Sequence, residues 1–196
     1  MRNAARSFFA AAVLLALPLA ACSANPEDAA ATGDPSEESE GEPQSTADES
    51  DALTSISCAA HSETGYKSGN AFAISVVTVG GREVERHTAN AFYVMAKAAA
   101  KDGVNLGVVS GFRTMSQQKY LYGCYIHCNC NGCNLAAKPG YSNHQSGHAL
   151  DLNTSSRGVY SWLANHAAHY GFHRTVSSEP WHWEWWGGGP GGGPCQ

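Results

Sequence analysis

The sequence lacks the features that define two large classes of protein. Its apolar run at 8–19 is shorter than the roughly 20 residues that a membrane-spanning helix needs. Its 12 lysines and arginines are scattered, with no basic run between aromatic residues, so nothing predicts a nucleic-acid partner. Segment 23–51 contains no lysine or arginine and almost nothing apolar to bury, which excludes it from a folded core.

The N-terminus has the features of an export signal. Two arginines precede the apolar run, which ends in the segment 19–22 (LAAC), and this pattern resembles the lipobox of bacterial lipoproteins. We therefore expect a signal peptide over 1–21 and a lipid on Cys22; plain cleavage without a lipid is the alternative. Because Ser23 rather than aspartate follows, the expected location is the periplasmic side of the outer membrane in a Gram-negative cell, and otherwise the cell envelope.

Segment 22–51 is predicted to be a disordered tether between the lipid and the folded domain. It holds ten of the 17 acidic residues of the chain, and as a flexible coil it would span about 30 Å. Its charge dominates the net charge of −5, because residues 52–196 carry ten lysines and arginines against seven acidic residues, a net charge of about +3. A mildly basic domain suits an anionic polymer such as cell wall.

Six cysteines follow Cys22, and an even number in an exported chain favours disulfides, with fifteen possible connectivities. A bridge between Cys58 and Cys195 would join the two ends of the domain. The other four, at 124, 128, 130 and 133, have spacing that could also hold a structural zinc ion. Both alternatives stay open for this cluster.

The apolar patterns predict one domain over 52–186, followed by a glycine-rich tail over 187–196 with no fold of its own. Thr88 and Thr114 are the expected N-caps of two helices. The predicted elements, in order, are a hairpin at 71–79 and 82–87, a helix to about 101, a strand at 104–109, a helix to about 122, a cysteine-rich loop at 123–140, a strand at 148–153, a helix at 156–170, and closing strands at 172–176 and 181–186.

A small set of residues has the composition of a hydrolytic zinc site, namely His144, Asp151, His182 and Glu179. Pro180 excludes a helix there, so a histidine ligand and a carboxylate three residues earlier can lie at a loop-to-strand junction. Glu184 could orient His182, with solvent exposure as the alternative.

The remaining histidines are expected to have no role in this chemistry. His148 does not form a metalloprotease HExxH motif with His144, because Gln145 replaces the required glutamate and Gly147 would interrupt the helix. His148 is therefore predicted to be structural or at the surface. The others lack a comparable carboxylate setting: His61, His87, His127, His166, His169 and His173.

Three spaced motifs together resemble the D-alanyl-D-alanine metallopeptidases of the VanY and VanX type. They are the serine, glycine, phenylalanine and arginine at 110–113, the pattern SxHxxGxAxD at 142–151, and ExxH at 179–182. The resemblance covers about 105–185. It implies an α+β fold with a small, mainly antiparallel sheet flanked by helices, related to the hedgehog and lysostaphin-like zinc folds.

The resemblance also implies the roles of individual residues. One zinc ion per chain would be held by His144, Asp151 and His182, and Glu179 would be the catalytic base. Arg113 would stabilise the developing oxyanion or bind the substrate carboxylate. The positions of Ser142 and Gln118 match residues near the substrate.

The implied activity is hydrolysis of D-alanine-containing bonds in peptidoglycan stem peptides. A D-alanyl-D-alanine carboxypeptidase is the first expectation, because the cysteine-rich insert is expected to wall one side of the cleft. An endopeptidase for cross-links or stem peptides is the alternative, and a non-catalytic wall-binding lipoprotein is the second alternative. Membrane contact is expected through the lipid anchor only, and no partner protein is implied.

Overall fold

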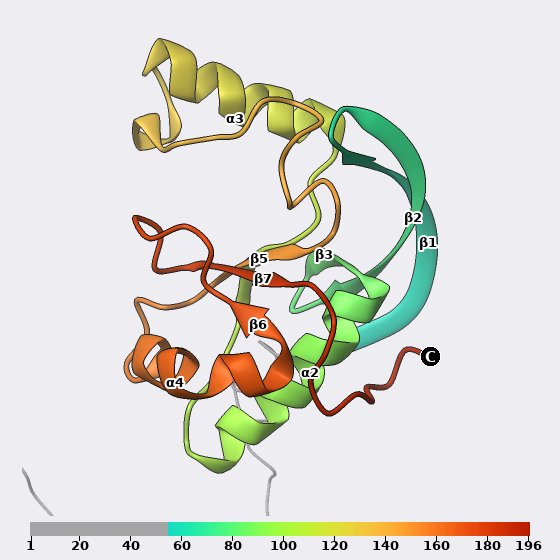
Figure 1. The fold of residues 1–196 in the computed structure, drawn as a ribbon, viewed down its shortest axis with the longest axis vertical. Helices are drawn as coiled ribbons and strands as arrows, with labels where there is room; N and C mark the ends of the chain where they lie inside the picture. Colours follow the sequence, from blue (N-terminus) through green and yellow to red (C-terminus); the bar gives the residue numbers. More distant parts are fainter. Residues whose placement is uncertain (1–54) are drawn as a thin grey trace, which may run out of the picture. The chain divides into compact units, whose positions relative to one another are not determined.

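The computed structural model describes residues 55–196. The predicted signal peptide, Cys22 and the tether lie outside the described residues. Figure 1 shows an α+β domain with α3 on one side of the second of its two sheets and α2 and α4 on the other. Within 55–196, no helix is long and apolar enough to cross a membrane.

The first sheet is an antiparallel meander with strand order β1-β2-β3. Its strands are β1 (Ile56–Lys67), β2 (Asn70–Val79) and β3 (Arg82–Glu85). The predicted hairpin is confirmed as β2 and β3, which are joined by two glycines with positive φ. β1 was missed by the sequence analysis because most of its side chains are exposed, so it has no apolar alternation to detect.

The second sheet positions the candidate site. Its order is β4-β5-β7-β6, and all of its pairs are antiparallel. The strands are β4 (Val108–Ser110), β5 (Ala149–Leu152), β7 (His182–Trp185) and β6 (Phe172–His173). In this register Asp151 lies directly opposite both Ser110 on β4 and His182 on β7, so segments far apart in sequence meet at one point.

The helices are α2 (Arg86–Lys101), α3 (Met115–His127) and α4 (Val159–His166). A short 3-10 helix follows each of the last two: η1 (Asn131–Cys133) after α3 and η2 (Ala167–Tyr170) after α4. The main core joins both sheets to α2 and α4. Its largest fully buried apolar side chains are Phe92, Phe172, Met95, Leu106, Leu150, Leu152, Leu163, Val77 and Val79.

Three helix predictions need correction. Glu85, not Thr88, caps α2: its carboxylate accepts from the Thr88 N–H at 2.8 Å, while the Thr88 hydroxyl donates to the Gly147 carbonyl. Thr114 is confirmed as the N-cap of α3, where it forms a capping box with Gln117, but α3 continues to His127, so the start of the predicted cysteine-rich loop is helical. The last predicted helix begins only at Val159, because Gly158 adopts a left-handed conformation, with φ 80°.

The structure pairs the six cysteines of the domain as three disulfides, Cys58–Cys195, Cys124–Cys130 and Cys128–Cys133. The first closes a loop of 137 residues. In the chain-entropy model, a bridge over a loop of this length lowers the entropy of the unfolded chain and so stabilises the fold by about 5 kcal/mol. The Asn90 side chain also binds the backbone of Cys195 at both its N–H and its carbonyl. The end of the glycine-rich tail is therefore attached to α2.

Candidate active site

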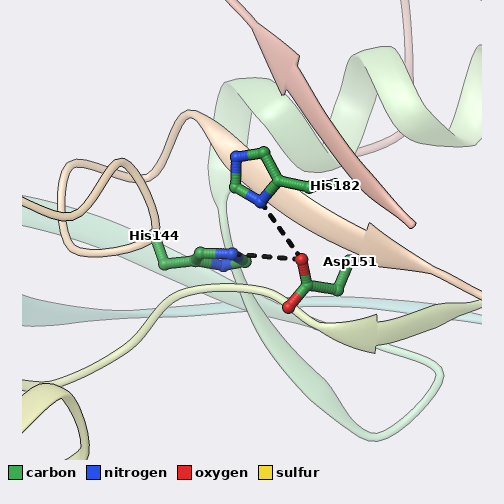
Figure 2. Close-up of side chains that lie close together, drawn as sticks. All are labelled: His144, Asp151 and His182. Atoms are coloured by element: carbon green, nitrogen blue, oxygen red, sulfur yellow. Dashed lines mark hydrogen bonds and ion pairs between the residues drawn. The ribbon is translucent and has the colours of Figure 1, made fainter. Parts of the chain in front are cut away.

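Three of the predicted side chains converge at the edge of β5 and β7. Asp151 Oδ1 lies 3.3 Å from His144 Nε2 and 3.2 Å from His182 Nδ1 (Figure 2). Asp151 and His182 come from paired strands, whereas His144 returns over β5 from a loop that turns at Gly147, where φ is 81°. All three residues are buried, and their donor atoms lie within 4.8 Å of one another.

The ring orientation of His144 is set by the backbone. Its Nδ1 lies 2.8 Å from the Gly111 carbonyl oxygen, which can only accept a hydrogen bond. Nδ1 therefore carries the proton, and Nε2 presents its lone pair toward Asp151. This is the tautomer that a metal ligand needs.

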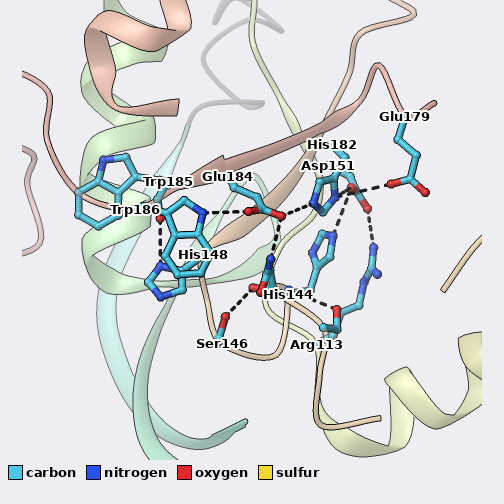
Figure 3. A network of polar contacts seen from close by, with 12 residues as sticks. Arg113, His144, Ser146, His148, Asp151, Glu179, His182, Glu184, Trp185 and Trp186 are labelled. Atoms are coloured by element: carbon cyan, nitrogen blue, oxygen red, sulfur yellow. Dashed lines mark hydrogen bonds and ion pairs between the residues drawn. The ribbon is translucent and has the colours of Figure 1, made fainter. Parts of the chain in front are cut away.

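Glu184 sets the orientation of His182 (Figure 3). His182 Nε2 lies 2.9 Å from Glu184 Oε1, which leaves Nδ1 facing Asp151. Glu184 also accepts from the Asn143 amide at 2.9 Å and from the Trp186 indole at 2.8 Å. Only 4% of Glu184 is exposed, so the alternative that this carboxylate is solvated at the surface is wrong.

These contacts determine which groups are charged in the metal-free site. Burial would raise the pKa of Glu184, but hydrogen bonds from His182, Asn143, Thr175 and Trp186 lower it to about 2. Burial would lower the pKa of His182, yet its hydrogen bonds to Asp151 and Glu184 raise it to about 9. A bound metal ion would therefore have to displace a proton from His182.

Arg113 pairs with the second oxygen of Asp151, through Nη2 and Oδ2. Its Nε donates to the Ser110 hydroxyl at 3.0 Å, so one residue of β4 and one residue of β5 hold the guanidinium in place. Burial would raise the pKa of Asp151, but its contacts with His144 and His182 and the charge of Arg113 hold it well below its ordinary value. Asp151 is thus an anion that faces two imidazoles with one oxygen and Arg113 with the other.

Glu179 lies beside the three residues without belonging to their tight cluster. Its Oε2 is 3.8 Å from His182 Nδ1, and its side chain is 16% exposed. Burial raises the pKa of Glu179. A carboxylate with a raised pKa at the edge of a cleft can both accept and return a proton.

A cleft of about 450 Å³ opens over these side chains, a volume suited to a small ligand. Ser142 lines it, and the Ser142 hydroxyl accepts from the His144 N–H at 3.3 Å. The far wall comes from the cysteine-rich insert, which contributes Asn131, Asn134 and Leu135. Other lining residues that sequence reasoning missed are Tyr141, Val176 and Trp181.

Gln118, which the resemblance places near the substrate, does not itself line the cleft but lies directly behind its wall. It is fully buried on α3, and its side-chain amide donates to the Ala137 carbonyl at 2.9 Å. Ala137 does line the cleft. Gln118 therefore supports the wall from behind.

Two predictions about the other histidines have opposite outcomes. His148 is structural, as predicted: Nδ1 lies 3.0 Å from the Trp185 carbonyl oxygen, and the ring stacks on Trp186. His61, in contrast, was expected to lack carboxylate neighbours. The structure corrects this, because His61 lies next to Glu63 and Glu83.

The sequence model of the VanY D-alanyl-D-alanine carboxypeptidase family matches residues 81–188, more than half of the chain. The chain belongs to this family. It is 28% identical over 124 residues to YodJ of Bacillus subtilis (strain 168), and 30% identical over 116 residues to a D-alanyl-D-alanine carboxypeptidase of Enterococcus faecalis (strain ATCC 700802 / V583). These matches cover 52% and 46% of this chain and 45% and 43% of the relatives, so the chain spans less than half of their length.

A solved member of the VanY family has the same fold. The structure of VanYB in complex with D-alanine-D-alanine superposes with a TM-score of 0.51 at 27% sequence identity. The match covers 59% of this chain and 79% of VanYB. The expected α+β fold, with small antiparallel sheets flanked by helices, is therefore confirmed.

Proposed function

We propose that this protein is a zinc-dependent D-alanyl-D-alanine carboxypeptidase that acts on peptidoglycan stem peptides. The observation that carries the proposal is the convergence of His144, Asp151 and His182 beside Glu179 and Arg113 in one cleft. Family membership and the similarity to VanYB, which was solved with D-alanine-D-alanine, support the substrate class.

The donor set fits zinc. Two imidazole nitrogens and one carboxylate oxygen are typical of catalytic zinc sites, which keep a further position open. Both histidines have their other ring nitrogen engaged, His144 by the Gly111 carbonyl and His182 by Glu184. Such second contacts fix the ring and raise its basicity as a ligand.

Glu179 and Arg113 then have separate tasks. When bound, zinc would polarise the scissile carbonyl and lower the pKa of water at the open position. Glu179 accepts the proton of the attacking water and returns it to the amine of the leaving D-alanine. Arg113 places its positive charge at the cleft, where it stabilises the oxyanion or the terminal carboxylate.

The insert favours a carboxypeptidase over an endopeptidase. Cys124–Cys130 ties the segment after α3 to the helix, Cys128–Cys133 closes that segment on itself, and residues from this segment wall the cleft. A wall limits what extends beyond the scissile bond, while Arg113 and Ser142 can bind a free terminal carboxylate. A substrate that ends in D-alanine satisfies both conditions.

A non-catalytic wall-binding role is the weaker candidate, because a binding protein has no use for Glu179 beside the metal ligands. The test is incubation of the domain with pentapeptide muropeptides and with cross-linked dimers, with products identified by mass. Release of D-alanine from pentapeptides supports the proposal. If monomers are released from the dimers and the pentapeptides stay intact, the protein is an endopeptidase. If neither substrate gives a product, the non-catalytic wall-binding role is favoured.

The same proposal includes the location. We infer that the chain is exported and held in the cell envelope by a lipid on Cys22, with segment 22–51 as its tether. The even number of cysteines in the domain supports export. An envelope location would also bring the cleft to peptidoglycan.

A further inference from the structure

We propose that His61, Glu63 and Glu83 form a second site for a divalent transition metal ion, on the first sheet and separate from the site of His144. His61 Nε2 lies 3.0 Å from Glu83 Oε1 and 3.7 Å from Glu63 Oε1. One donor atom from each residue can be chosen so that all lie within 4.8 Å of one another. Zinc is the ion used to test the site.

The backbone brings the three donors together from the two edge strands of the first sheet. His61 and Glu63 are two residues apart on β1 and so share a face of the strand. Glu83 lies on β3, and β2 runs between the two strands. The irregular register of β1 between Ser57 and His61 is the kind of feature that redirects a side chain in a sheet.

The chemistry of the cluster calls for a cation. Two carboxylates converge on one imidazole nitrogen, and a single N–H there can bond well to only one of them. A divalent ion would bind all three groups and remove the repulsion between the carboxylates. One imidazole and two carboxylates suit zinc and other divalent transition ions.

Exposure predicts that this site is weaker than the buried one. The side chains of His61, Glu63 and Glu83 are 48%, 34% and 40% exposed. Water can therefore complete the coordination of an ion, but binding must fix three partly exposed side chains in one arrangement. The His144 site should retain zinc in zinc-free buffer, whereas the His61 site should fill only when free zinc is present.

A metal ion here would connect β1 to β3 next to the candidate active site. The Glu83 carbonyl accepts from the Phe112 N–H at 2.7 Å, one residue before Arg113. A bound ion would thus brace the strand that supports the Arg113 loop. The melting temperature of the protein should rise with free zinc even when the His144 site is already filled.

Equilibrium dialysis of the full domain against buffered free zinc tests the second site. We expect about two zinc ions per chain in the wild type and about one in His61→Ala and in Glu83→Gln. His169→Ala, which removes an exposed histidine outside both clusters, should keep about two. Retention of one ion by His61→Ala in zinc-free buffer shows that the variant is folded.

Three outcomes would overturn the second site. They are one zinc ion in the wild type at saturation, two ions retained in His61→Ala, and the same zinc-dependent rise in melting temperature in wild type and His61→Ala. If two ions persist in His61→Ala, titration of free thiols shows whether reduced cysteines hold one of them. These outcomes leave the proposed carboxypeptidase intact, because they do not involve the His144 site.

Discussion

Glu179→Gln should leave zinc bound while removing most of the catalytic rate. The substitution keeps the size of the side chain and removes its ability to accept a proton. It therefore separates a catalytic base from a metal ligand, two roles that a carboxylate three residues before His182 could have.

The geometry sets the size of both effects. Glu179 Oε2 lies 3.8 Å from His182 Nδ1, whereas Asp151 Oδ1 lies 3.2 Å from the same nitrogen. Glu179 is thus the outer of the two carboxylates, and its loss leaves His144, Asp151 and His182 to hold the metal. Removal of a proton-transfer group costs roughly 10²-fold or more in rate, which corresponds to at least about 2.7 kcal/mol of activation free energy.

The assay is release of D-alanine from a pentapeptide, with zinc measured by elemental analysis of the same preparation. Burial raises the pKa of Glu179, so more of this carboxyl is protonated at a given acid pH than of an ordinary glutamate. The base must be deprotonated to act, so wild-type kcat/KM should fall as the pH falls through this raised pKa. The residual activity of Glu179→Gln should lack that decrease.

Lys101→Gln is the control, because Lys101 is exposed in the last turn of α2 and lies outside the cleft. It should keep the wild-type rate. Loss of zinc in Glu179→Gln would make Glu179 a ligand, and a rate within a few-fold of wild type would assign the base to another group. Either result would refute the assignment of Glu179 as the base.

Further predictions concern the metal, its surroundings and the processing of the chain. Alanine at any of the three ligand positions should abolish or greatly reduce zinc content in zinc-free buffer, where the wild type should hold about one ion per chain; retention of zinc in all three variants would reject the site. Glu184→Ala should weaken zinc binding by roughly 10- to 100-fold, because His182 loses the acceptor of its Nε2–H. Glu184→Gln keeps an acceptor oxygen and should recover part of the lost zinc affinity. Zinc affinity is measured by competition with a chelator, and equal affinity in the wild type and both variants would contradict this role of Glu184. Intact mass of the mature protein should show an acyl group on Cys22 and six cysteines that alkylate only after reduction; no acyl mass rejects the anchor, and alkylation without reduction rejects the disulfides.

Local signals in the sequence determined several parts of the structure. Thr114 predicts the start of α3, because an N-cap acts on backbone N–H groups within three residues of it. The two glycines at 80–81 predict the β2–β3 turn for the same local reason. The spacing of His144, Asp151, Glu179 and His182 identified the candidate site through its resemblance to a family.

Other features depend on contacts between residues far apart in the chain. The sequence could not show that Gln118 is buried, because its burial depends on the packing of α3 against the segment that contains Ala137, 19 residues later in the chain. The sequence suggested the Cys58–Cys195 bridge, but the pairs within the cluster at 124–133 depend on how that loop folds, so its spacing alone could not choose them. His61 has Glu63 nearby in sequence, but its closer contact, Glu83, lies across β2.

The candidate site shows which of its properties follow from the sequence and which follow from the tertiary structure. The sequence alone determined which side chains could bind a metal ion, because ligand chemistry belongs to the residue. Only the tertiary structure decided that they meet, because Asp151 and His182 are 31 residues apart and face each other through the register of β5 and β7. The same register gives His182 the buried Glu184 as its partner, and burial, unlike residue type, is a property of the whole fold.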